Sequence, residues 1–66
     1  MKIIFQGLEK ATTAQTVAGF LAEEKINTQG VVLELNGEIH RPGQNLEELK
    51  LHEGAALNLF RIVAGG

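Results

Sequence analysis

Cysteine is absent from this chain of 66 residues. Without a thiol, the protein can form no disulfide bond, no thiolate metal site and no cysteine nucleophile. Long hydrophobic segments are also missing, because the longest apolar runs have three residues, as in Ile3-Ile4-Phe5. A membrane-spanning helix needs about 20 apolar residues. The chain also opens without the pattern of a signal peptide, so we expect a protein of the cytoplasm.

Basic residues are too few and too scattered for a surface that binds nucleic acid. Six Lys and Arg stand against eight Asp and Glu, which gives a formal net charge of −2. His40 and His52 lack the spacing of a metal site, so we expect structural or surface roles and no bound metal. Glu47, Glu48 and Glu53 are expected to form an acidic patch, either simply solvated or facing basic residues of a partner.

The length and composition favour one small globular domain. Hydrophobic residues make up 44% of the chain, which is too many for a disordered protein. A core of this size leaves only about 3–5 kcal/mol of net stability. It also lacks the walls of a substrate pocket of several hundred Å³. A carrier, a binding module or a small subunit is therefore favoured over an independent enzyme.

Four short segments have the pattern of β-strands and are joined in pairs by two-residue turns. The predicted strands are 1–5, 8–12, 31–35 and 38–40. The turns are Gln6-Gly7 and Asn36-Gly37, and glycine at the second position favours hairpins with type I′ geometry. The sequence therefore predicts two β-hairpins separated by about 20 residues.

The segment between the hairpins has the period of a helix. Its apolar residues recur at positions i, i+3 and i+4, namely Val17, Phe20 and Leu21. Thr16 is the predicted N-cap, with Thr13 as the alternative if the helix begins earlier. Lys25 is expected in the last turn, where a cation suits the helix dipole. Glu24 does not fit the pattern, because it occupies a position that should be apolar.

A final strand over 56–63 completes the predicted domain. An irregular link over 44–54 precedes it, with leucines at 46, 49 and 51 available to fill the core. Because two hairpins already occupy the sheet edges, the final strand is expected beside the first strand and parallel to it. The sequence thus predicts an α+β, β-grasp fold with a mixed sheet of four to five strands on one helix. Residues 1–63 form this domain, and 64–66 form a flexible tail.

Strand alternation divides the side chains between two faces of the sheet. The inner face is expected to contain Ile3, Phe5, Leu33, Leu35, Leu57 and Leu59, packed on Val17 and Leu21. The open face then holds Ile4, Phe60 and Ile62, with Val32 beside them. A small protein rarely exposes such a cluster without a partner, so we interpret it as a docking surface. The alternative is a register shift that buries Phe60.

The chain ends in Gly65-Gly66, which is thin and conformationally permissive enough to enter a narrow channel in a partner. Four residues beyond Ile62 reach roughly 13 Å when extended. A terminal carboxylate is a poor electrophile and must first become an acyl-adenylate on a separate, ATP-using enzyme. A sulfur donor can then convert it to a thiocarboxylate. The alternative is an ordinary frayed terminus.

The chain resembles the ThiS family, the sulfur carriers of thiamine biosynthesis. The resemblance rests on Glu34-Leu35-Asn36-Gly37-Glu38-Ile39, the Thr16-Val17 helix start and the ending Ala64-Gly65-Gly66, and it extends over essentially the whole length. It implies that an E1-like enzyme (ThiF) adenylates the tail, that a cysteine-desulfurase system supplies sulfur and that the thiazole synthase ThiG receives it. Gly66 is then the thiocarboxylate site and Gly65 its threading neighbour.

Three alternatives remain open within this interpretation. A MoaD-like carrier for molybdopterin synthesis has the same fold and tail but is usually longer. A ubiquitin-like protein modifier needs the same adenylated Gly66, and a plain interaction module would carry the glycines incidentally. In each case we expect a monomer when free, no activity as an enzyme and no cofactor bound by this chain. No glycine-rich phosphate loop is present, so ATP is expected on the partner.

Overall fold

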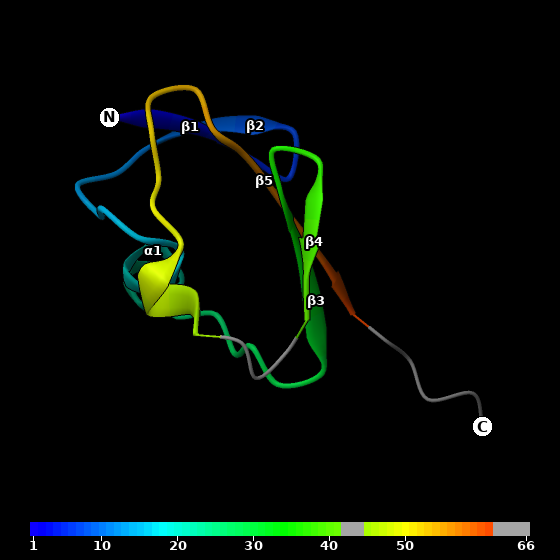
Figure 1. Ribbon diagram of the computed structural model, residues 1–66. Coiled ribbons are helices and arrows are strands. Elements are labelled where there is room, and N and C mark those ends of the chain that lie inside the picture. The colour runs from blue at the N-terminus through cyan, green and yellow to red at the C-terminus, as the bar shows by residue number, and fades with distance from the viewer. Residues whose placement is uncertain (42–44, 62–66) are drawn as a thin grey trace.

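The structure is a computed structural model that describes residues 1–41 and 45–61. One helix packs on a mixed sheet of five strands with the order β2-β1-β5-β3-β4. The elements are β1 (Lys2–Phe5), β2 (Leu8–Ala11), α1 (Val17–Glu23), β3 (Val31–Leu35), β4 (Glu38–His40), the 3₁₀ turn η1 (Leu46–Glu48) and β5 (Ala56–Arg61). Figure 1 shows α1 and η1 together on one side of the sheet.

Both predicted hairpins are confirmed. Gln6 and Gly7 have φ angles of 52° and 81°, and Asn36 and Gly37 have φ angles of 52° and 87°. Positive φ at both central positions defines the type I′ turn, whose twist matches that of the flanking strands. Each turn therefore closes an antiparallel pair, β1 with β2 and β3 with β4.

The final strand lies in the middle of the sheet, as predicted. β5 runs parallel to β1 through the pairs Ile4–Ala56 and Phe5–Leu57, and antiparallel to β3 from the pair Leu35–Leu57 to the pair Val31–Arg61. The predicted α+β fold of one helix on a mixed sheet is thus confirmed. β5 is described to Arg61, so the predicted extension to residue 63 and the predicted tail over 64–66 lie outside the described residues.

The helix begins at the predicted cap but ends differently from the prediction. The Thr16 hydroxyl accepts a hydrogen bond from the Gly19 N–H at 3.1 Å, which confirms Thr16 as the N-cap. Lys25 lies beyond the helix with a φ of 56°, so its predicted place in the last turn is wrong. The N–H groups of Lys25 and Ile26 bind the carbonyls of Ala22 and Leu21, which is the Schellman ending.

Replacing Thr16 with alanine is expected to lower the free energy of unfolding by about 1 kcal/mol. The N-cap hydroxyl satisfies a helix N–H that has no partner within the helix. Thr16→Ser keeps this acceptor and should stay within about 0.5 kcal/mol of the parent. Urea unfolding measures both variants, and equal losses for alanine and serine would contradict the capping role.

The charged side chain of Glu24 at an expected apolar position is explained by an ion pair with a residue distant in sequence. Its carboxylate lies 2.7 Å from the Lys10 ammonium on β2, and the Glu24 side chain is only 24% exposed. This pair joins the end of α1 to an edge strand of the sheet. A charged residue therefore stands where helical periodicity alone predicts an apolar one.

The core lies between α1 and the inner face of the sheet. Its buried cluster is Ile3, Val17, Phe20, Leu21, Leu33, Leu35, Leu51, Ala55 and Leu57, with Phe5, Leu46, Leu49 and Leu59 partly buried against it. The predicted inner set and the three link leucines are thus confirmed. The link also holds the helix start, since the Val17 N–H donates to the Leu49 carbonyl at 2.9 Å.

Candidate functional site

The open face of the sheet carries the predicted cluster close to the end of β5. Val32 on β3 lies directly opposite Phe60 on β5, and Ile4 on β1 lies opposite Ala56. Phe60 is 52% exposed, so the prediction of an exposed ring is confirmed and the alternative register that buries it is wrong. Ile4 and Val32 are half-buried. Ile62 lies outside the described residues.

Ile39 also belongs to this face, although it is absent from the set predicted from the sequence. Its side chain is 54% exposed and stands opposite Glu34 in the β3–β4 hairpin. Val32 is its diagonal neighbour on the same face. The alternation was available in the sequence, because the Asn36-Gly37 turn fixes which residues face each other. We use the name docking face for Ile4, Val32, Ile39 and Phe60, the surface that is proposed below to bind a partner.

A polar pair crosses the docking face between its two ends. The Asn58 amide donates a hydrogen bond to the Glu34 carboxylate at 3.1 Å, and the two residues are directly opposite each other. The Glu34–Asn58 pair lies between Ile4 and Ala56 on one side and Val32 and Phe60 on the other. The face therefore combines apolar area with fixed hydrogen-bonding groups, as the surfaces of specific protein interfaces do.

The proposed reactive end follows the docking face along the chain. Gly65 and Gly66 lie outside the described residues, so their predicted roles stay predictions. Phe60 is followed by Arg61, the last described residue of β5. The apolar end of the docking face is thus only a few residues before the glycines in the sequence.

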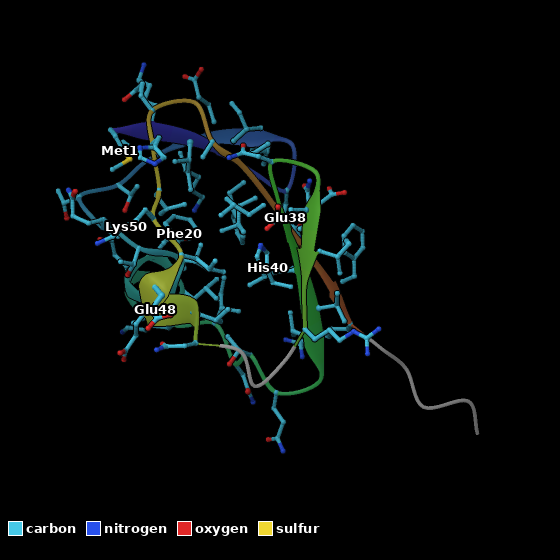
Figure 2. All side chains as sticks on the ribbon, viewed as in Figure 1. Met1, Phe20, Glu38, His40, Glu48 and Lys50 are labelled. Carbon is cyan, nitrogen blue, oxygen red and sulfur yellow. The ribbon has the colours of Figure 1, made fainter. Side chains whose placement is uncertain are left out.

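The histidines take different environments. The His40 side chain is only 11% exposed, and its Nε2 lies 3.3 Å from the Glu38 carboxylate on the same strand. Figure 2 shows His40 directed from β4 toward the interior of the molecule. His52 is exposed. Within the described residues, no three side chains of His, Cys, Asp or Glu come together as a metal site would require.

The three glutamates predicted to form one acidic patch do not do so. Glu47 and Glu48 are exposed on η1, beside α1. Glu53 instead accepts a hydrogen bond from the Lys2 N–H at 3.1 Å, at the start of β1. Figures 1 and 2 show the turn after Lys50 and η1 at different ends of the molecule. The prediction failed because the chain leaves η1 in an extended conformation at Leu49 and reaches the start of β1 at Glu53.

A shallow depression near the N-terminus offers little to a ligand. It is lined by Met1, Ala11, Thr12, Thr13 and Glu23. The Thr12 hydroxyl donates to Glu23 at 2.7 Å, and the Met1 ammonium donates to the Thr12 carbonyl at 2.9 Å. These polar groups are already occupied by one another.

None of the helices formed by the described residues has the length and apolar character needed to span a membrane.

The architecture and the exposed sheet face define a β-grasp protein. A crystal structure of the thiamine biosynthesis protein ThiS from Geobacter metallireducens superposes with a TM-score of 0.83 at 23% identity, covering 100% of both chains. The model of the ThiS family matches residues 3–66. This chain therefore belongs to the ThiS family. A comparison of the sequence with curated proteins found no match.

Proposed function

We propose that this protein is a sulfur carrier of thiamine biosynthesis. Its Gly66 carboxylate is adenylated by a ThiF-like, E1-like enzyme and then converted to a thiocarboxylate. A ThiG-like thiazole synthase receives the sulfur, which comes originally from a cysteine-desulfurase system. The observation that carries this proposal is the family match, which includes Gly65 and Gly66 at the end of a β-grasp domain.

The chemistry assigns the reactive atom to this chain and the catalysis to its partners. The anionic carboxylate attacks the α-phosphorus of ATP, and pyrophosphate leaves. A sulfur nucleophile then attacks the acyl carbon, so that a carbon–sulfur bond forms as the bond to AMP breaks. Where the nucleophile is a persulfide, a thiol then reduces the resulting acyl disulfide and releases the thiocarboxylate. The carrier supplies the acyl group and a recognition surface, and small carriers of the ThiS family are not themselves catalysts. ATP binds the adenylating partner.

The docking face supplies recognition in this scheme. Phe60, at its apolar end, lies a few residues before the tail in the sequence, so binding there brings Gly66 toward the partner's nucleotide. Aromatic anchors at the centre of an interface dominate binding energy. The Glu34–Asn58 pair gives the same face a directional contact. One surface can thus serve both the adenylating enzyme and the sulfur acceptor in turn.

Replacing Phe60 with alanine is expected to weaken binding to the adenylating enzyme by about 2 kcal/mol, roughly 30-fold in Kd. Stability should change by less than about 1 kcal/mol, because the ring is 52% exposed. Leu8→Ala is the matched control, since Leu8 is 69% exposed on the far edge strand β2. Calorimetric titration gives the affinities. Equal affinities for Phe60→Ala and the parent would show that Phe60 does not contribute to the interface.

Peptide analysis of cell extracts separates a carrier from a protein modifier. A carrier accumulates as a free protein whose last residue is a thiocarboxylate. A modifier leaves branched Gly-Gly remnants on lysines of other proteins. We expect thiocarboxylate and no such remnants, and remnants traceable to this chain would overturn the proposal.

A further inference from the structure

The hairpin turn between β1 and β2 reaches across to β5 through one side chain. The Leu59 N–H donates to Gln6 Oε1 at 3.0 Å, and Gln6 Nε2 donates to the Leu59 carbonyl at 3.3 Å. The carboxamide of Gln6 therefore binds both backbone groups of a single residue on β5. We call this two-bond contact the Gln6 clasp.

The clasp continues the parallel ladder after β1 has ended. The Ile4 N–H binds the Ala55 carbonyl at 2.7 Å, and the Gln6 N–H binds the Leu57 carbonyl at 3.0 Å. The next position on β5 is Leu59, but the backbone turns away at Gly7 with a φ of 81°. The Gln6 side chain supplies the donor and acceptor that a longer β1 would have supplied.

A second two-bond contact, made by one side-chain and one backbone group of Asn36, holds the other end of β5. The Asn36 N–H donates to the Ala56 carbonyl at 2.8 Å, and the Ala56 N–H donates to Asn36 Oδ1 at 2.9 Å. Gln6 and Asn36 occupy equivalent turn positions with the same φ of 52°. They differ in what they hold, because Ala56 begins β5 whereas Leu59 lies two residues before its last described residue, Arg61.

We propose that Gln6 is a positioning residue for the carrier's tail. By binding Leu59, it keeps β5 paired on both sides to within two residues of Arg61, and so orients the described end of the strand that leads to the tail. This inference rests on the proposed function, because its consequence is the delivery of Gly66 to the adenylating enzyme. Preorganisation of this kind lowers the ordering cost of binding.

The location of the clasp favours positioning over a purely structural role. Both of its hydrogen bonds are exposed to solvent. Such bonds add little to the free energy of unfolding, because water can replace either partner. The core and the β3–β5 ladder hold the rest of the strand without it. Loss of the clasp should therefore loosen the segment around Leu59 while the domain stays folded.

The test compares Gln6→Ala with Asn36→Ala. Both changes place alanine at the same turn position, so their backbone costs are matched. Gln6→Ala removes both hydrogen bonds to Leu59, whereas Asn36→Ala removes the side-chain bond to Ala56 and keeps the backbone one. Steady-state ATP–pyrophosphate exchange by a ThiF-type adenylating enzyme gives KM and kcat for each carrier. Amide hydrogen exchange at Leu59 reports the clasp directly, and thermal unfolding confirms that each variant is folded at the assay temperature.

We expect Gln6→Ala to raise KM roughly fivefold with kcat within about twofold of the parent. Exchange at Leu59 should also become faster. Asn36→Ala should leave KM unchanged. Gln6→Glu keeps the acceptor for the Leu59 N–H but loses the donor, and it should fall between Gln6→Ala and the parent. A parent-like KM for Gln6→Ala, or an equal rise for Asn36→Ala, would overturn the positioning role. Failure of the parent itself to support exchange would instead refute the proposed function.

Discussion

Removal of Gly66 is expected to lower the rate of tail adenylation at least about 100-fold. The shortened chain still ends in a carboxylate, but that group is withdrawn by about 3.5 Å from the α-phosphorus of the partner's ATP. Displacements of about 1 Å from the productive geometry already cost about two orders of magnitude. The free energy of unfolding should stay within about 0.5 kcal/mol of the parent, since residue 66 follows the described domain.

Two further variants define the cause of this loss. Gly66→Ala keeps the length and the carboxylate but adds a Cβ, so it tests whether the channel tolerates a side chain. One alanine appended after Gly66 displaces the carboxylate in the opposite direction and should also abolish adenylation unless a protease trims it. If the shortened chain were adenylated as fast as the parent, Gly66 would not be the reacting residue.

Replacing Phe20 with alanine is expected to destabilise the protein by about 3–5 kcal/mol. Phe20 is completely buried, and its ring packs edge-on against Phe5 with the centroids 5.0 Å apart. Figure 2 shows it on the helix side of the core. Because a domain of this size has about 3–5 kcal/mol of net stability, much of the variant should be unfolded at 25 °C.

Phe60→Ala is the matched control, because it removes the same side chain from the open face of the sheet. Phe60 is 52% exposed and its loss should cost less than about 1 kcal/mol. Urea unfolding of the two variants compares a buried with an exposed phenylalanine directly. Similar losses for both would mean that Phe60 also belongs to the core, and the docking face would have to be redrawn.

Local signals in the sequence were sufficient for most of the fold. Glycine at position 7 and again at 37 specified the two turns, and Thr16 specified the helix start. Alternation on β3 and β5 separated Leu33 and Leu57, which are buried, from the exposed Phe60. Each of these signals depends on residues within a few positions of one another, so a short stretch of the chain is enough to recognise it.

Features that depend on distant residues could not be predicted in this way. Lys10 pairs with Glu24, and Gln6 binds Leu59, across 14 and 53 positions of the chain. Lys25 adopts a positive φ that glycine usually supplies, so the helix end carried no glycine signal. In the candidate site, Ile39 was missed because the faces of the short return strand were not assigned.

The most direct test of the sulfur-carrier proposal is the intact mass of the protein after reaction. The purified chain is incubated with a ThiF-type adenylating enzyme, ATP and a sulfur donor, and its peptides are then mapped. The proposal predicts a mass increase equal to the exchange of one oxygen for one sulfur, located at Gly66 and lost when ATP is omitted. An unchanged mass in the complete reaction, or a sulfur located at any other residue, would contradict it.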